Sequence, residues 1–275
     1  MVSRKDYNKL AVDAAHSVLL ELARILGEYR ADIAVIGGWV PSLLLENAEE
    51  KHIGSIDVDI AINHKTIGDC GYETIRSLLK KHGYTEGKQP FIFFRDVQVG
   101  SETINVEVDL LAGEYSGTGN GHRTQKIQDI RARKARGCEL AFEIQSHKTV
   151  EGWLPNGAKD SATVRVAGIV SFIVMKGMAL HDRIKEKDAW DIYYCMKNYP
   201  GGIDTLIEDF HPHLSNALVS EGLHKIAKKF ASVGHFGPVA VADFLEITDY
   251  EERAFIQRDA YERTMAVLSA LRIIS

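Results

Sequence analysis

The stretch Ser55–Ile62 constrains the fold more than any other part of the chain, because it reads SIDVDIAI and alternates polar with apolar residues. A period of two is typical of a β-strand, on which Asp57 and Asp59 share one face. The opposite face carries Ile56, Val58 and Ile60. Two neighbouring carboxylates repel each other, and a hard divalent cation such as Mg²⁺ removes that repulsion. The alternative is a solvated face of an edge strand that discourages aggregation.

A glycine pair precedes this acidic strand. The β-branched run Ile33–Ile36 predicts a buried strand that ends at Gly37 and Gly38. Trp39–Leu45 is expected to form a helix, with Pro41 in its first turn, where a missing N–H costs little. A turn before a helix N-terminus presents backbone N–H groups and a favourable dipole to phosphate, although a Gly-Gly pair is also a common plain turn.

A second acidic strand follows. Thr103–Leu111 reads TINVEVDLL, and the pattern predicts a hairpin between it and Phe91–Val99. Glu107 and Asp109 fall on its polar face. Asp109 is therefore a candidate third Mg²⁺ ligand, and a candidate base that takes the proton of an attacking hydroxyl.

These residues together suit nucleotidyl or phosphoryl transfer, which needs metal ions, a phosphate cradle and an in-line nucleophile. Asp57 and Asp59 supply carboxylates for one or two Mg²⁺ ions, and Gly37 and Gly38 supply backbone N–H groups. Ser55 lies on the same strand face as Asp57, so its hydroxyl is expected to contact a phosphate oxygen.

The totals are those of an ordinary globular protein. The chain has 275 residues with 45% hydrophobic and 26% charged side chains, and its net charge is -5. Three separated cysteines form no CxxC pair, which favours a reducing cytoplasm over a disulfide framework. Neither a signal peptide nor an apolar run of about 20 residues is evident, so no membrane association is expected.

The remaining pattern divides the chain in two. Before residue 167 we expect helices at Lys5–Tyr29 and Tyr72–His82, and strands at Glu139–Gln145 and Thr163–Val166. After that point the pattern is helical and ends in a long helix from Asp249 to Ile273. The sequence therefore predicts an α+β fold, with a mixed-sheet core and N-terminal helix in residues 1–166 and an all-helical domain in residues 167–275.

A glycine-rich loop and a basic stretch lie within the first part. The glycines are Gly113, Gly117, Gly119 and Gly121, and the basic residues are Arg123, Lys126, Arg131, Arg133, Lys134 and Arg136. Such a stretch can follow a nucleic-acid backbone. The alternative is a solvated helix face, which the acidic total favours.

The order of these motifs resembles the nucleotidyltransferase superfamily whose core is like that of DNA polymerase β. The matching residues are Gly37, Gly38, Asp57, Asp59 and Asp109. The resemblance implies that Asp57 and Asp59 bind Mg²⁺, and that the two glycines contact the phosphates of a bound NTP.

Two features depart from the common form of that family. The spacer before Asp57 is longer, and Trp39 stands where many members carry Ser or Thr. The GGW form also occurs in antibiotic nucleotidyltransferases, which act on aminoglycosides or lincosamides. This favours a small hydroxylated acceptor as an alternative.

The second part resembles the AbiEii-type family, the toxins of abortive-infection toxin–antitoxin systems. Lys176 lies inside an apolar helical segment, and KDAWD follows with Asp188 and Asp191 on one helical face. The resemblance implies that Lys176 contacts the triphosphate and that Asp191, or else Asp188, orients the lysine or acts as base. The helical domain would then complete the active-site cleft.

The sequence thus predicts a cytoplasmic, Mg²⁺-dependent nucleotidyltransferase that moves a nucleotidyl group from an NTP, such as ATP, to a hydroxyl acceptor. By resemblance the acceptor is an RNA, such as a tRNA 3′ end, or a protein, and a cognate antitoxin is a partner. Two alternatives stay open: an antibiotic nucleotidyltransferase, and a non-catalytic nucleotide-binding or antitoxin-like module.

Overall fold

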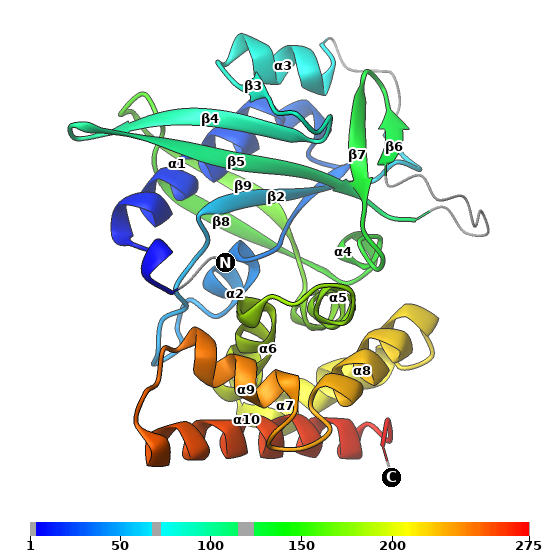
Figure 1. The fold of residues 1–275 in the computed structure, drawn as a ribbon. Helices are drawn as coiled ribbons and strands as arrows, with labels where there is room; N and C mark the ends of the chain where they lie inside the picture. Colours follow the sequence, from blue (N-terminus) through cyan, green and yellow to red (C-terminus); the bar gives the residue numbers. More distant parts are fainter. Residues whose placement is uncertain (1–3, 68–72, 115–123, 275) are drawn as a thin grey trace. The chain divides into compact units, whose positions relative to one another are not determined.

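The computed structural model describes residues 4–67, 73–114 and 124–274 (Figure 1). These residues divide into two compact units. The sheet unit comprises Asp6–Leu44 and Ile53–Gly168, and the helical unit comprises the chain from Ile169 onward with Leu45–His52 and the first described residues. The predicted α+β class with a mixed sheet is confirmed. Several residues singled out above lie outside the described ranges: Cys70, Tyr72, Gly117, Gly119, Gly121 and Arg123.

One mixed sheet forms the centre of the sheet unit, with the strand order β3-β4-β5-β2-β1-β9-β8. Its strands are β1 (Ile33–Ile36), β2 (Asp57–Ile62), β3 (Thr85–Glu86), β4 (Ile92–Val99), β5 (Glu102–Ala112), β8 (Gln145–Trp153) and β9 (Lys159–Ala167). Strand β2 pairs antiparallel with β1 and parallel with β5. Strands β4 and β5 form the predicted hairpin, which turns at Gly100. The two predicted acidic strands are therefore direct neighbours.

Helix α1 (Lys9–Ile25) packs across one face of this sheet (Figure 1). The Asn8 side chain caps its first turn by accepting a backbone N–H at 3.0 Å. Its fully buried residues, each worth roughly 1.5–3 kcal/mol of burial, include Leu19, Leu20 and Leu22. Because α1 meets the face that carries Ile60, the side chains of Asp57 and Asp59 lie on the opposite face.

Three shorter helices and one 3₁₀ turn also belong to the sheet unit. They are η2 (Gly27–Tyr29), α2 (Trp39–Leu44), α3 (Ile75–Lys81) and α4 (Leu140–Glu143). The 3₁₀ turn η1 (Arg4–Asp6) contains the point, after Lys5, at which the chain divides between the two units. The predicted strand Glu139–Gln145 is wrong, because α4 occupies it and strand β8 begins only at Gln145. The segment Leu140–Glu143 has only four residues. That is too short for its hydrophobic pattern to distinguish a helix from a strand.

Residues 124–134 of the basic stretch form a β-hairpin, so the interpretation of this part as a helix face is wrong. Strands β6 (Thr124–Ile127) and β7 (Ile130–Lys134) pair antiparallel, and β7 also pairs parallel with the end of β5. Ile130 and Ala132 are buried while Arg131 is exposed, which is the period of two expected for a strand. The hairpin therefore sets basic side chains beside the acidic strand β5.

The helical unit is built from six α-helices and a 3₁₀ turn within its described residues. They are α5 (Ile169–Asp182), α6 (Glu186–Asn198), α7 (Gly202–Phe210), η3 (His211–His213), α8 (Ala217–Lys229), α9 (Phe236–Phe244) and α10 (Tyr250–Ala270). The backbones of α5 and α8 approach closely where Gly177 meets Gly222. A Cβ atom on Gly177 would lie 2.7 Å from the Gly222 carbonyl oxygen, so this contact requires glycine.

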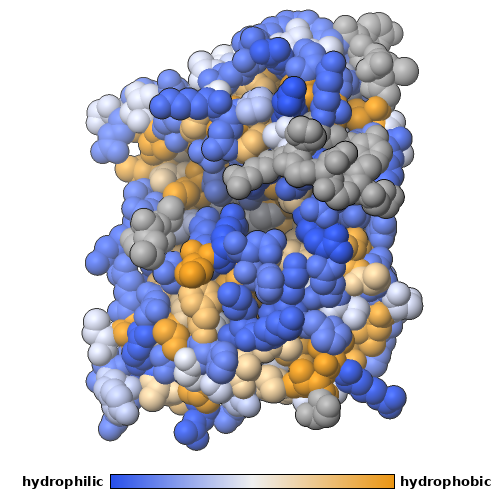
Figure 2. Space-filling view, turned by 45° about the vertical axis from the view of Figure 1, so that its right-hand side comes forward, coloured by the Kyte–Doolittle hydropathy of each residue, from blue (hydrophilic) through white to orange (hydrophobic). Residues whose placement is uncertain are grey.

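The visible surface is mainly hydrophilic. On the face drawn in Figure 2, polar side chains predominate and apolar ones lie in small separate patches. In the described part of the chain, no helix is long and apolar enough to cross a membrane.

Candidate active site

Four carboxylates gather on one face of strands β2 and β5, and we call this group the acidic edge. Its members are Asp57, Asp59, Glu107 and Asp109. The parallel register places Asp57 beside Glu107 and Asp59 beside Asp109. Residues in register on neighbouring strands point to the same face, and neighbouring strands lie about 4.8 Å apart. The sheet therefore forces like charges together, as expected where a cation or a set of donors is to be bound.

The turn after β1 fits closely against this edge. Gly37 has a φ of +68°, a left-handed conformation that favours glycine. A Cβ atom added to Gly37 would lie 1.9 Å from Oδ2 of Asp59. The carboxylate of Asp59 thus occupies the space that any other side chain at this position would need. Gly38 follows directly, at the start of helix α2.

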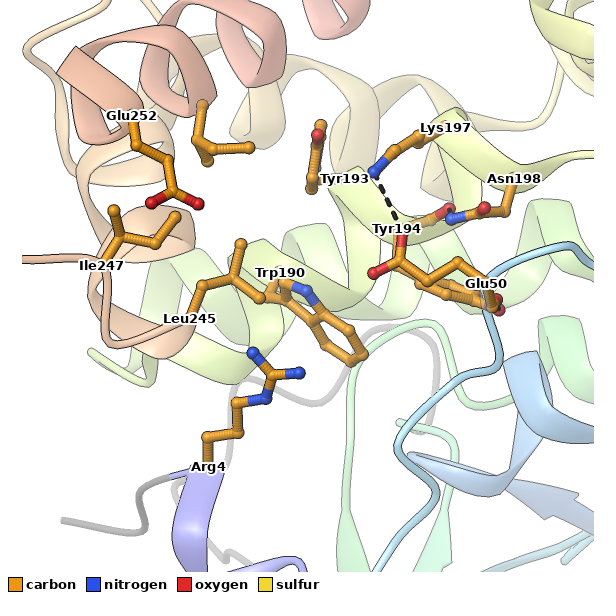
Figure 3. Close-up of a pocket in the computed structure, with 11 residues that line it drawn as sticks. Arg4, Glu50, Trp190, Tyr193, Tyr194, Lys197, Asn198, Leu245, Ile247 and Glu252 are labelled. Carbon is orange, nitrogen blue, oxygen red and sulfur yellow. Dashed lines mark hydrogen bonds and ion pairs between the residues drawn. The ribbon is translucent and has the colours of Figure 1, made fainter. Parts of the chain in front are cut away.

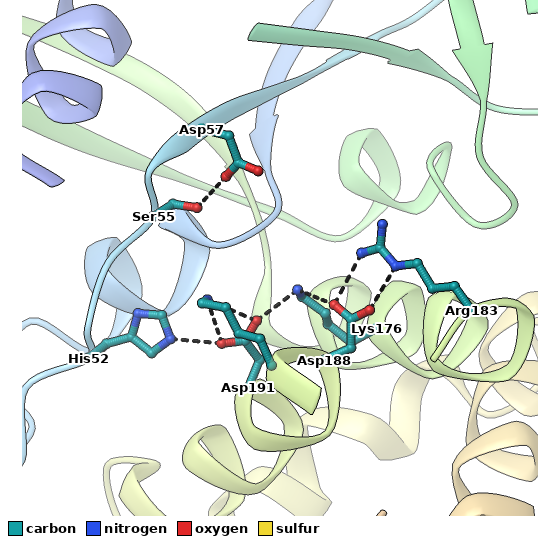
Figure 4. Close-up of polar contacts among 8 residues, drawn as sticks. His52, Ser55, Asp57, Lys176, Arg183, Asp188 and Asp191 are labelled. Atoms are coloured by element: carbon teal, nitrogen blue, oxygen red, sulfur yellow. Dashed lines mark hydrogen bonds and ion pairs between the residues drawn. The ribbon is translucent and has the colours of Figure 1, made fainter. Parts of the chain in front are cut away.

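Asp57 is held from two sides. The Ser55 hydroxyl donates to Oδ1 of Asp57 at 2.5 Å, as Figure 4 shows. The indole N–H of Trp39 donates to the backbone carbonyl of Asp57 at 2.9 Å. Trp39, which departs from the common family form, therefore fixes the start of the acidic strand. Ser55 is only 3% exposed, and its hydroxyl orients the carboxylate of Asp57.

Asp109 forms an ion pair with a residue of the basic hairpin. Nη2 of Arg133 lies 3.1 Å from Oδ2 of Asp109. The guanidinium of Arg133 also lies over the ring of Phe91, 5.8 Å from its centroid. The predicted third ligand, Asp109, thus has a cation beside it that the sequence pattern did not indicate.

The acidic edge can bind Mg²⁺ through the carboxylates of Asp57 and Asp59. In the described ranges, no group of three or more His, Cys, Asp or Glu side chains stands in an arrangement that could hold a metal ion. Mg²⁺ that arrives with a nucleotide needs only one or two carboxylates, because phosphates and water fill its other positions. Asp57 and Asp59 meet that requirement, and Asp109 as a further ligand stays a prediction.

The described cysteines offer no competing chemistry. Cys138 and Cys195 are both fully buried. Burial raises the pKa of each thiol above its ordinary value. A buried thiol with a raised pKa is a poor nucleophile, because the thiolate is the reactive form.

A second group of predicted residues meets within the helical unit. Nζ of Lys176 lies 2.7 Å from a carboxylate oxygen of Asp188 and 2.7 Å from one of Asp191. Arg183 donates to both oxygens of Asp188 (Figure 4). Lys187 donates to both oxygens of Asp191. The sequence prediction left open which aspartate meets Lys176, and the structure shows that both do. We call these five residues the charge cluster.

The ionisation of the charge cluster follows from its pairing. Burial alone would lower the pKa of Lys176, but Asp188 and Asp191 raise it above its ordinary value. Burial would likewise raise the pKa of each aspartate, yet the neighbouring cations hold Asp188 below and Asp191 well below the usual value. Lys176, Asp188 and Asp191 are therefore charged at neutral pH.

His52 closes one end of the charge cluster. Its Nε2 lies 3.0 Å from Oδ1 of Asp191 (Figure 4). The imidazole stacks on Trp190 at 4.9 Å and meets the edge of Tyr194 at 4.8 Å. Burial is the main cause that lowers the pKa of His52 to about 4. The ring is therefore neutral at pH 7, and its Nε2–H donates to the ionised Asp191, which can only accept.

A pocket of ≈ 240 Å³ lies in the helical unit beside these aromatic rings (Figure 3). Trp190, Tyr193 and Tyr194 of α6 form one wall. Lys197 and Glu50 pair across its rim at 2.9 Å. The rest of its lining combines apolar side chains, Leu245, Ile247 and Ile256, with polar ones, Arg4, Asn198 and Glu252.

The sequence predicted several of these residues and missed their partners. The acidic edge and the Lys176 pairing follow the predicted positions, but Arg133, Arg183, Lys187 and His52 were not assigned to them. The four-residue spacing of Lys187 and Asp191 was a readable helical pair. His52 gave no local signal, since its partner lies 139 residues away.

Comparison of the chain with protein-family models, with curated protein sequences and with solved structures finds no match.

Proposed function

We propose that this protein is a Mg²⁺-dependent nucleotidyltransferase. The observation that carries the proposal is the in-register pair Asp59 and Asp109 beside the left-handed turn at Gly37. Together with Asp57 these residues combine carboxylates for a metal with a glycine turn at a helix start. That is the combination that transfer from a nucleoside triphosphate requires.

The proposed reaction joins an acceptor oxygen to the α-phosphorus of the NTP. The bond from that phosphorus to the bridging oxygen of the β-phosphate breaks, and pyrophosphate leaves. Asp109 takes the proton of the acceptor hydroxyl, and Ser55 and the amides of Gly37 and Gly38 contact the phosphates. Bound Mg²⁺ supplies charge neutralisation on the phosphate oxygens. The resemblance also assigns Lys176 and Asp191 to this reaction, and that assignment stays a prediction.

We propose RNA as the acceptor, for example the 3′ end of a tRNA. The support is the basic hairpin β6–β7, which pairs with β5 and carries Lys126 and Lys134. Such side chains bind a phosphate backbone through its charge. A protein acceptor, and a role as an AbiE-type toxin with a cognate antitoxin, belong to the same proposal by resemblance alone.

The test is label transfer from each of four [α-³²P]NTPs in the presence of Mg²⁺, with total RNA, an aminoglycoside or a lincosamide as the acceptor. We expect label on RNA, reduced at least about 100-fold by Asp59→Asn. The matched control is Asp96→Asn, which removes an exposed carboxylate on β4 that pairs with Asn105, four residues before Asp109 on β5. We expect this control to retain activity.

Two other outcomes would change the proposal. Label on an aminoglycoside or lincosamide, and none on RNA, would replace the acceptor and keep the chemistry. Label on no acceptor, or equal transfer by Asp59→Asn and wild type, would overturn the enzyme proposal.

A further inference from the structure

Arg133 stands at the junction of the basic hairpin and the acidic edge. It lies on β7, which pairs parallel with β5 so that Arg133 is in register with Leu111. Leu111 and Asp109 are two residues apart and share a face. Arg133 therefore points to the same face as the acidic edge, and its Nη2 contacts Asp109 at 3.1 Å.

The guanidinium of Arg133 has more N–H donors than its contact with Asp109 uses. It carries five N–H groups, of which the contact with Asp109 engages one side. The side chain of Arg133 is 35% exposed, whereas that of Asp109 is 13% exposed. The ring of Phe91 makes a cation–π contact with the guanidinium, whose central carbon lies 5.8 Å from the ring centroid. The free side of a planar, oriented guanidinium is suited to bidentate binding of a phosphate.

We propose that Arg133 is a phosphate-binding residue of the nucleotide site, and this inference rests on the proposed function above. Arg133 binds oxygens of the NTP triphosphate and neutralises the charge that builds up on the departing pyrophosphate. Its contact with Asp109 also offsets the repulsion between Asp109 and the in-register neighbour Asp59.

Arg131 provides a matched control for this proposal. It lies two residues before Arg133 on β7, so it has the same charge and points to the same face. Arg131 is exposed. A general electrostatic effect of the hairpin would respond equally to both substitutions, whereas direct phosphate binding would respond only to Arg133.

The experiment is calorimetric titration of the full chain with inorganic tripolyphosphate, with an NTP and with the matching nucleoside, all in Mg²⁺. We expect Arg133→Gln to weaken tripolyphosphate and NTP at least about tenfold, because a charged hydrogen bond is lost. Nucleoside binding should stay unchanged, and Arg131→Gln should change each affinity less than about threefold. Arg133→Lys, which keeps the charge beside Asp109, should lie between wild type and Arg133→Gln.

Thermal melting of each variant shows whether it is folded, and Arg133→Lys serves as the test if Arg133→Gln is not. Equal losses in Arg131→Gln and Arg133→Gln would overturn the inference, and so would a parallel loss of nucleoside binding. If the wild type binds NTP and substitution of Arg133 leaves that affinity unchanged, this inference is overturned and the proposed function is not. A wild type that binds neither NTP nor tripolyphosphate would overturn both.

Discussion

His52 is expected to be a neutral, buried histidine whose pKa lies far below its ordinary value. Two effects oppose each other at this ring. The Asp191 carboxylate at 3.0 Å favours the imidazolium, but burial and the charges of Lys187 and Lys176 disfavour it. The side chain of His52 is only 1% exposed, and Asp191 is already shared with both lysines. Burial therefore prevails, and the pKa falls to about 4.

This shift fixes the sign and size of a pH effect on stability. The folded pKa lies below the ordinary value of 6.5, so the unfolded chain takes up the proton first as the pH falls. The stabilisation is complete above pH 6.5 and is lost as the pH falls toward 4. A shift of one pKa unit corresponds to about 1.36 kcal/mol. The uptake of a proton at His52 should therefore lower the free energy of unfolding by about 2 kcal/mol as the pH falls from about 7.5 to about 5.

The assay is NMR titration of the histidine ring signals, assigned by comparison with His52→Gln. Glutamine can still donate to Asp191 but does not titrate. The His52 signal should titrate near pH 4, and urea denaturation should show wild type losing about 2 kcal/mol relative to the variant over that range. A His52 midpoint at or above 6.5 would refute the reasoning, because it would mean that Asp191 outweighs burial.

Three further predictions concern packing and charge. Gly37→Ala should reduce label transfer at least about 100-fold and lower the melting temperature, because its Cβ would displace the Asp59 carboxylate. Gly177→Ala should lower the free energy of unfolding by about 1–3 kcal/mol, because the added Cβ would force α5 away from α8. Gly234→Ala should lower it far less, because a Cβ at Gly234 would have nothing within 4 Å. Urea denaturation of the two variants makes the comparison. Lys176→Met should cost about 2–4 kcal/mol by urea denaturation at pH 7, because two buried carboxylates lose a shared cation.

The elements that the sequence predicted well have strong local signals. Strand β1 has the predicted bounds Ile33–Ile36, since a β-branched run ends at a glycine that adopts a positive φ. The period of two in β2 and β5 predicted which carboxylates share a face. The register that sets Asp59 beside Asp109 could not be predicted, because strand pairing depends on contacts between residues far apart in sequence.

The elements that were missed have weak or conflicting signals. The stretch IRARK alternates Ile130 and Ala132 with arginines, so the strand period was present but was outweighed by its charge. Leu140–Glu143 is too short to show any period. The partners of Asp191 illustrate the same limit at the site, since Lys187 lies one helical turn away and His52 lies on a distant segment.

The central claim is that the acidic edge supports transfer of a nucleotidyl group rather than a phosphoryl group. The most direct measurement compares reactions of wild-type protein, Mg²⁺ and RNA with NTP labelled at the α- or the γ-phosphate. The account predicts that the α-label enters the acceptor, that the γ-label leaves as pyrophosphate in equal amount, and that Asp57→Asn abolishes both. Transfer of the γ-label to an acceptor, or α-label incorporation that persists in Asp57→Asn, would contradict it.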